Sequence, residues 1–258
     1  MNTDYRDCLS QLESRSLLPP DPRAVYVAGS LVRGWGNQRS DLDVYVITGT
    51  QWLSDTAQHE TVALRPDIVL VESIYVDDRR WDIEYWLDLQ IDELFGKISS
   101  SLTGNQPAGK HMTAPEVAIL QRFGHAQSVT GDEWLSQRRR VLKGLPVNEV
   151  MTLRALHMLD IYTEDAVGQL AAGDVESAVL STKLAFRHAV DALLANNGEF
   201  GESMKWFARR FRSANPKQMT FQAYWDIETM RSFDPNCPAA WVEEVLLECQ
   251  RIAQEVGV

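Results

Sequence analysis

The chain has 258 residues, of which 45% are hydrophobic and 24% charged, a composition typical of globular proteins. Its formal charge of −11 argues against broad non-specific binding to DNA or RNA, but it leaves room for a local basic pocket. No apolar run approaches the roughly 20 residues of a transmembrane helix, and the N-terminus lacks a signal-peptide pattern. The three cysteines are odd in number and have no metal-ligand spacing, which favours a reducing compartment. Together these features predict a cytoplasmic protein that does not contact membranes.

The first third of the chain predicts one helix followed by short strands. Leucines at helical spacing over residues 5–17 end at a group of prolines. Strands are expected over residues 24–28, 41–47, 68–76 (one strand or two short ones) and 81–86, with a short helix and a loop over residues 31–40.

Helical periodicity dominates after about residue 90. Helices are expected over residues 91–101, 115–123, 133–142, 147–172, 175–196, 203–212 and 238–256. Between the two longest, Gly173 suits a C-cap and Asp174 an N-cap, so they should form an antiparallel hairpin. Strands followed by helices predict an α+β chain, with one domain over residues 1–143 and a helical domain over residues 144–258.

Two carboxylates are the most informative feature of the sequence. Asp41 and Asp43 are two residues apart on a predicted strand, so their side chains leave the same face while Leu42 and Val44 point towards the core. Adjacent carboxylates repel one another unless cations lie between them. Hard oxygen ligands on a rigid strand are typical of a divalent-metal site for phosphoryl chemistry.

Two further segments belong to the same pattern. Gly29-Ser30 lies at a strand-to-helix turn, where a backbone N–H and the Ser30 hydroxyl can hold a phosphate. Asp82 and Glu84 share a face of the last predicted strand, so either could supply a third carboxylate.

Gly29-Ser30, Ser40 directly before Asp41-Leu42-Asp43, and Asp82 resemble the signature of the DNA polymerase β-like nucleotidyltransferase superfamily. The resemblance covers roughly residues 24–86. It implies a small mixed sheet with helices on one side, two Mg²⁺ ions, and attack of an acceptor hydroxyl on the α-phosphate of an NTP.

The resemblance also implies residue roles. Asp41 and Asp43 would bind both metal ions, and Asp82 would bind the catalytic one. Gly29 and Ser30 would hold the β- and γ-phosphates, with Ser40 as a further motif residue of the nucleotide site. Glu84 would then be a supporting group or the general base.

The helical half more weakly resembles the second domain of aminoglycoside nucleotidyltransferases and HEPN-like bundles. Such domains place basic residues on the triphosphate. Lys205 is the first candidate for that role, and Arg187 and Lys183 come next. Asp160, Glu164 and Asp165 crowd one helix and could bind a cationic acceptor or supply a base.

The predicted function is therefore Mg²⁺-dependent transfer of a nucleoside monophosphate, AMP from ATP, onto a hydroxyl of a small molecule such as an aminoglycoside-like compound or a natural-product intermediate. Two alternatives stay open: an antitoxin-type enzyme that modifies a protein or tRNA, and a non-catalytic nucleotide-binding module. Nucleic acid is not the expected partner, and the oligomeric state stays open.

Overall fold

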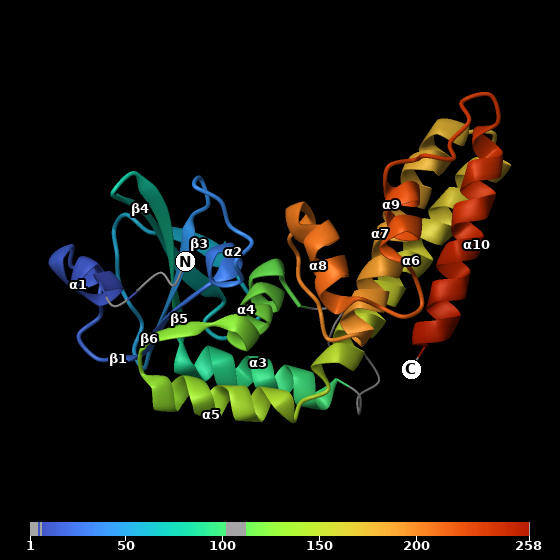
Figure 1. Ribbon diagram of the computed structural model, residues 1–258. Helices are drawn as coiled ribbons and strands as arrows, with labels where there is room; N and C mark the ends of the chain where they lie inside the picture. Colours follow the sequence, from blue (N-terminus) through green and yellow to red (C-terminus); the bar gives the residue numbers. More distant parts are fainter. Residues whose placement is uncertain (1–4, 6, 102–111, 258) are drawn as a thin grey trace. The chain divides into compact units, whose positions relative to one another are not determined.

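The computed structural model describes Tyr5, residues 7–101 and residues 112–257. These residues divide into two compact units (Figure 1). Unit 1 contains the residues up to 100 together with residues 112–145, and unit 2 contains Ser101 and residues 146–257. The division after Leu145 lies two residues from the predicted one.

Unit 1 is built on a mixed sheet with the strand order β3-β4-β5-β2-β1-β6. The strands are β1 (Pro22–Ala28), β2 (Leu42–Thr48), β3 (Gln58–Thr61), β4 (Ile68–Val76), β5 (Arg79–Leu87) and β6 (Gln127–Thr130). β2 and β5 run parallel, and the other neighbouring pairs are antiparallel. The predicted α+β class with a small mixed sheet is confirmed.

The two faces of this sheet have different neighbours. On one face, Val25, Val44 and Ile83 pack in an apolar core with Leu12 of helix α1 (Asp7–Ser14). On the other face, aromatic rings link the strands to helices α3 (Asp88–Ser100), α4 (Ala114–His125) and α5 (Asp132–Lys143). Phe123 of α4 is the centre of that cluster, 5.6 Å from the ring of Tyr26.

Helix α4 is held in place by a buried carboxylate. Glu116 is fully buried, accepts backbone hydrogen bonds from Ala63 (2.6 Å) and Thr113 (3.2 Å), and pairs with Lys97 at 2.9 Å. A buried charge with this many partners is well compensated, so α4 has a defined position over the sheet.

Unit 2 consists of helices packed around one apolar core. They are α6 (Val147–Ala171), α7 (Val175–Asn196), the 3₁₀ turn η2 (Met204–Trp206), α8 (Phe207–Ala214), α9 (Phe221–Glu228) and α10 (Pro238–Val256). The predicted hairpin of α6 and α7 is confirmed: Gly173 has φ +80°, and the side chain of Asp174 accepts a hydrogen bond from Ser177 N at 3.2 Å.

Several elements differ from the sequence expectations. Strands β3 and β6 and helix α9 were not predicted. β3 and β6 are short, mostly polar edge strands held by backbone pairing, so they carry little hydrophobic signal. The helix expected over residues 203–212 is η2 followed by α8, residues 68–76 form a single strand, and β2 begins at Leu42 rather than Asp41.

Among the described residues, no helix combines the length and the apolar character needed to cross a membrane.

Candidate active site

Two carboxylates face one another across the parallel strands β2 and β5. The register pairs Asp43 with Asp82 and Tyr45 with Glu84. Neighbouring strands lie about 4.8 Å apart, and residues in register point to the same side of a sheet. The intervening Val44 and Ile83 are fully buried in the apolar core on the opposite face. Asp82 and Glu84 therefore lie on one face of β5, as predicted, and Ile83 lies on the other.

Gly29 brings the turn after β1 against the same carboxylate. Ala28 at the end of β1 pairs with Asp43, and Gly29 follows with φ +80°. A Cβ at Gly29 would lie 1.8 Å from Asp43 Oδ2, closer than any side chain permits. Glycine is thus required twice here, for the left-handed backbone and for the contact with the carboxylate.

Ser30 follows at the start of the short helix α2 (Gly29–Val32) and is buried. Its carbonyl accepts hydrogen bonds from the backbone N–H groups of Trp35 (2.8 Å) and Gly36 (2.9 Å). These bonds fold the connecting loop back over the turn. The backbone of Gly29 and Ser30 is therefore fixed by strand pairing on the β1 side and by the hydrogen bonds from the loop on the other side.

Asp43 lies in a field of several charges. Burial raises its pKa to about 6; Arg122 opposes the rise, and Asp41, Glu84 and Asp82 add to it. Asp41 directly precedes β2 and is partly buried. Three other carboxylates are thus close enough to Asp43 to disfavour its charged form, which is the electrostatic condition expected at a cation site.

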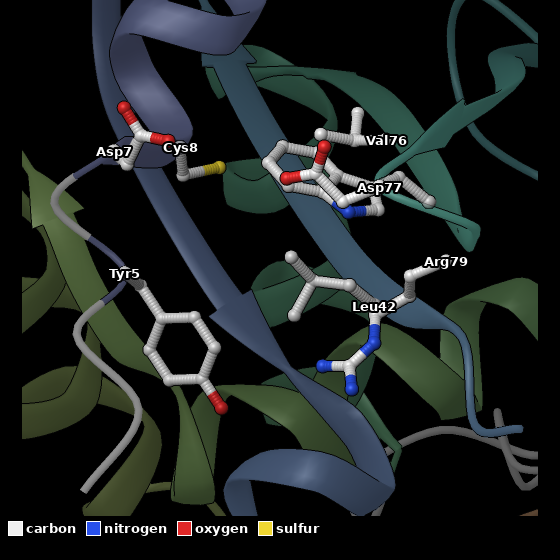
Figure 2. A pocket seen from close by; sticks show the side chains of 8 residues that line it. Tyr5, Asp7, Cys8, Leu42, Val76, Asp77 and Arg79 are labelled. Atoms are coloured by element: carbon white, nitrogen blue, oxygen red, sulfur yellow. The ribbon is translucent and has the colours of Figure 1, made fainter. Parts of the chain in front are cut away.

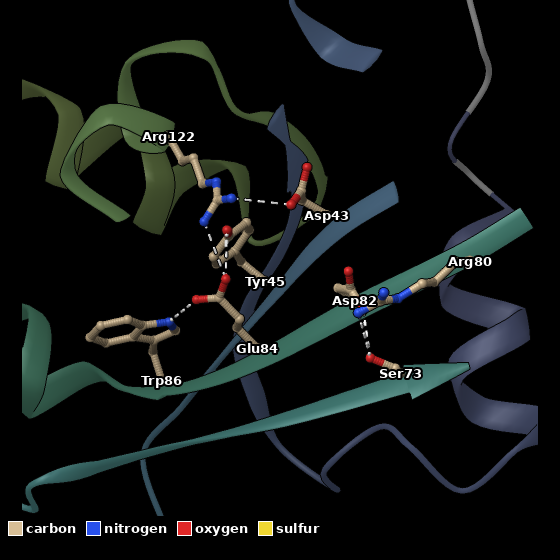
Figure 3. A network of polar contacts seen from close by, with 8 residues as sticks. All are labelled: Asp43, Tyr45, Ser73, Arg80, Asp82, Glu84, Trp86 and Arg122. Carbon is tan, nitrogen blue, oxygen red and sulfur yellow. Dashed lines mark hydrogen bonds and ion pairs between the residues drawn. The ribbon is translucent and has the colours of Figure 1, made fainter. Parts of the chain in front are cut away.

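Arg122 was missed in the sequence, yet it compensates two of these carboxylates. From α4 its guanidinium donates to Asp43 (3.1 Å) and Glu84 (3.2 Å) and lies 5.2 Å from the centre of the Tyr45 ring (Figure 3). Burial alone would lower the pKa of Arg122, but the neighbouring acidic groups raise it above its usual range, so the side chain stays charged. No local pattern singles out Arg122 in the sequence, because its partners Glu84 and Asp43 lie 38 and 79 residues away along the chain.

Glu84 is held by three donors. Its Oε1 accepts from Tyr45 Oη (2.8 Å) and from Arg122, and its Oε2 accepts from Trp86 Nε1 (2.9 Å). Asp82 has different partners: its Oδ1 accepts from Ser73 Oγ (2.6 Å) and Arg80 Nε (2.9 Å) (Figure 3). The two carboxylates share a face of β5 but belong to separate networks.

As the side chains lie, the described residues contain no group of three His, Cys, Asp or Glu close enough to hold one metal ion. Asp43 and Asp82 are both turned towards arginines. Their oxygens are the hard donors that Mg²⁺ prefers, and a pair in register on adjacent strands fits such an ion chemically. A bound cation would take the charge-compensating place that the two arginines hold here.

The other predicted nucleotide-binding residues lie in varied surroundings. The Ser40 hydroxyl accepts from Asn37 N (2.9 Å) and closes the loop before Asp41. In unit 2, Arg187 pairs with Glu228 at 2.8 Å, and the exposed Lys205 lies 5.8 Å from the ring centre of Trp206. Their roles towards a nucleotide stay predictions.

A cavity of about 280 Å³ lies on the other face of the sheet (Figure 2). Leu42 and Trp81, which point away from the Asp43 face, help to line it. The other lining residues are Tyr5, Asp7, Cys8, Val76, Asp77 and Arg79. The cavity is therefore separate from the carboxylate face.

The fold was compared with known proteins. It resembles the crystal structure of a nucleotidyltransferase-like protein from Exiguobacterium sibiricum, with a TM-score of 0.53 and 11% sequence identity. The similarity covers 97% of this chain and 74% of that one. The chain has a nucleotidyltransferase-like fold. No family model matches the chain, and no curated protein matches it either.

Proposed function

We propose that the chain is a Mg²⁺-dependent nucleotidyltransferase that moves a nucleoside monophosphate, AMP from ATP, onto a hydroxyl of a small-molecule acceptor and releases pyrophosphate. The observation that carries the proposal is the register of Asp43 and Asp82 beside the Gly29 turn. The nucleotidyltransferase-like fold supports it.

Asp41, Asp43 and Asp82 would hold the metal ions, the first two contributing to both and Asp82 to the catalytic one. Bound Mg²⁺ would neutralise the carboxylates and the phosphates and would polarise the α-phosphate for attack. To take up this role, Asp43 would turn from Arg122 and Asp82 from Arg80, each by a change of side-chain conformation. The rigid parallel pair of strands would keep the two backbones in place during this change.

Glu84 is assigned a supporting role rather than that of metal ligand or general base. Its two oxygens already accept three hydrogen bonds, so binding a metal would break the contacts with Tyr45, Trp86 and Arg122. In this arrangement Glu84 holds Arg122, and Arg122 holds Asp43 in a defined orientation. Asp82 is the better third ligand.

The triphosphate would be bound by Ser30 and by the backbone N–H groups after Gly29. Ser40 would keep the loop before Asp41 closed through its bond from Asn37. Lys205 is the first candidate for the triphosphate and is exposed, whereas Arg187 would have to leave Glu228.

The acceptor is proposed to be cationic or neutral and small. The net charge of −11 and the exposed carboxylates of Asp160, Glu164 and Asp165 on α6 favour a positively charged compound. We also place the protein in the cytoplasm, because its three cysteines are free thiols.

A transfer assay tests the proposal. Purified protein is mixed with Mg²⁺, each labelled NTP and a panel of aminoglycosides and other hydroxylated small molecules, and pyrophosphate release is measured. We expect release with ATP and a small acceptor, and no release after Asp43→Asn or after chelation of Mg²⁺. Label on protein or tRNA would instead favour the antitoxin-type alternative, and nucleotide binding without turnover would favour a non-catalytic module.

A further inference from the structure

The charge of unit 2 is distributed unevenly. The segment of residues 203–225 contains five basic residues and no acidic one. Since the whole chain carries −11, the remainder carries −11 − 5 = −16. Such a local excess of positive charge stands out in an acidic protein and is typical of a surface that meets an anion.

Most of this charge lies on one side of α8. Arg209 and Arg212 are three residues apart on α8, which brings them to one helix face, and Lys205 lies in the preceding turn η2; all three are exposed. Phe207 and Phe211 occupy the opposite face and are buried in the core. The helix is therefore sharply divided between an apolar inner face and a basic outer face.

Arg210, in the same helix, is buried and stabilises the fold of unit 2 through its polar contacts. It is 1% exposed, pairs with Asp191 at 2.8 Å and donates to the carbonyl of Gly201 at 2.9 Å. The outer Arg209 and Arg212 instead contact aromatic rings, and they form no ion pair with a carboxylate among the described residues. Within that part of the chain, their positive charge is available to an external anion.

Aromatic rings lie among these cations. The ring of Trp206 has Lys205 at 5.8 Å and Arg209 at 5.5 Å from its centre. The guanidinium of Arg212 lies 3.4 Å from the centre of the Phe221 ring.

That second cluster continues into α9. Phe221 stacks in turn on Trp225, with the ring centres 5.9 Å apart and an angle of 14° between the ring planes. Trp225 is 43% exposed, an unusual position for a tryptophan in a packed helical unit. The surface thus offers planar stacking groups next to cations.

We propose that this surface, formed by Lys205, Trp206, Arg209, Arg212, Phe221 and Trp225 and called the α8 surface below, binds single-stranded nucleic acid. Cations that follow a phosphate backbone and aromatic rings that stack on exposed bases are the two features that single-strand binding requires. A duplex would use only the cations, because its bases are already stacked on one another. The proposal concerns unit 2 and shares Lys205 with the proposed nucleotide site, but binding of a single strand needs neither Mg²⁺ nor transfer and can be measured without them.

The negative charge of the rest of the chain should weaken the binding of a nucleic acid to the α8 surface. Its repulsion limits the affinity, so we expect binding to be of micromolar strength and to weaken steeply with salt. The net charge argues against broad binding of nucleic acid over the whole protein, and that argument is compatible with one local site.

The test uses the full chain with EDTA and without NTP, so that its failure and a failure of the transfer assay are distinguishable. Fluorescence anisotropy of a labelled mixed-sequence single-stranded RNA is measured at about 50 mM and about 200 mM NaCl. We expect saturable binding that is much weaker at the higher salt concentration.

Variants of the α8 surface sharpen the test. Arg209→Gln combined with Arg212→Gln should weaken binding about tenfold or more and reduce the salt slope by about 1.4, that is, about 0.7 for each charge removed. Trp225→Ala should weaken binding about tenfold with the salt slope unchanged, because stacking does not release counterions. The matched control, Arg140→Gln with Lys143→Gln, removes the same charge from exposed positions of α5 and should bind like wild type.

Several results would overturn the proposal: no saturable binding by the wild-type chain, an equal loss in the α5 control, or tighter binding of duplex than of single strand. Displacement of the RNA by tripolyphosphate as effectively as by unlabelled single-stranded RNA at the same phosphate concentration would show that stacking contributes nothing, and it would also overturn the proposal. Circular dichroism checks folding, and if the double variant unfolds, Arg209→Gln and Trp225→Ala are compared singly.

Discussion

Asp43 is the side chain on which most of the candidate site converges. It lies in register with Asp82, touches the position where Gly29 has no side chain, and accepts a hydrogen bond from Arg122. Burial without full compensation gives it a raised pKa. A carboxylate in this state stabilises a bound cation more than it stabilises the fold, as is typical of functional residues.

The raised pKa of Asp43 predicts a pH-dependent stability. The folded state binds the Asp43 proton more tightly than the unfolded state, because the folded pKa is about 6 and the ordinary value is near 4. Its contribution to the free energy of unfolding therefore falls as the pH rises through this range, by at most about 3 kcal/mol, and is constant above it. The Asp43→Asn variant does not ionise at this position, so it does not lose this stability as the pH rises. In EDTA, the Tm of Asp43→Asn minus the Tm of wild type should therefore increase between about pH 4 and about pH 6.

Thermal unfolding followed by circular dichroism in EDTA measures this difference. Asp132→Asn removes an exposed carboxylate at the start of α5 and serves as the control. A Tm difference for Asp43→Asn that does not change over the same pH range would contradict the electrostatic account of the site.

Arg122 is predicted to stabilise the metal-free fold. Arg122→Met keeps much of the side-chain volume but leaves the carboxylates of Asp43 and Glu84 without their shared cation, which should cost about 3 kcal/mol in urea unfolding. Arg122→Lys should restore part of this, because it keeps the charge but not the two-pronged geometry. Arg140→Met at an exposed position of α5 should have little effect, and a loss below about 1 kcal/mol for Arg122→Met would show that the network is not stabilising.

Three strands and one turn position the carboxylates. Antiparallel β1 brings its end to Asp43, and parallel β5 brings Asp82 to the other side of β2. β2 is buried on both faces apart from Asp43, and β5 is buried from Trp81 onward apart from Asp82 and Glu84, which keeps the carboxylates on a rigid base.

The turn after β1 can be tested with two glycines. Gly29 and Gly34 both have positive φ (+80° and +68°), but of the two only Gly29 would bring an added Cβ into contact with a neighbour, the Asp43 carboxylate. Gly29→Ala should therefore abolish transfer and lower the free energy of unfolding by about 3 kcal/mol, through strain and through displacement of Asp43.

Gly34→Ala is the matched control, because it adds the backbone strain alone, about 1 kcal/mol. We expect it to retain most of the transfer activity. Equal kcat/KM and equal urea midpoints for the two variants would mean that the close contact between Gly29 and Asp43 affects neither transfer nor stability.

The residues proposed for the reaction are divided between the two units of the chain. The acidic residues expected to bind metal all belong to unit 1, and Lys205 and Arg187 belong to unit 2.

Lys205→Ala tests the contribution of unit 2. If Lys205 binds the triphosphate, its loss should raise the apparent KM for the NTP about tenfold while kcat changes less, because a charge-assisted contact with phosphate is worth about 1.5 kcal/mol or more. Lys143→Ala, an exposed lysine of α5, is the control. An unchanged KM for Lys205→Ala would remove Lys205 from the nucleotide site.

Elements with strong periodicity, and residues adjacent along the chain, could be predicted from the amino-acid sequence. They include the strands around Asp43 and Asp82, the α6–α7 hairpin with its Gly173 and Asp174 caps, and the α+β class, because these depend on local hydrophobic spacing and turn chemistry. Edge strands β3 and β6 could not be predicted in this way, because they are held by backbone pairing that has no side-chain pattern.

Which groups meet became visible only in the folded chain. The parallel register of β2 and β5 placed Asp43 beside Asp82, and the packing of α4 brought Arg122 to Asp43 and Glu84, which lie 79 and 38 residues away along the chain. Contacts over such separations follow from the packing of whole elements and not from local propensity. For that reason the acidic residues of the site could be indicated by their spacing along the chain, whereas the cation that compensates them could not.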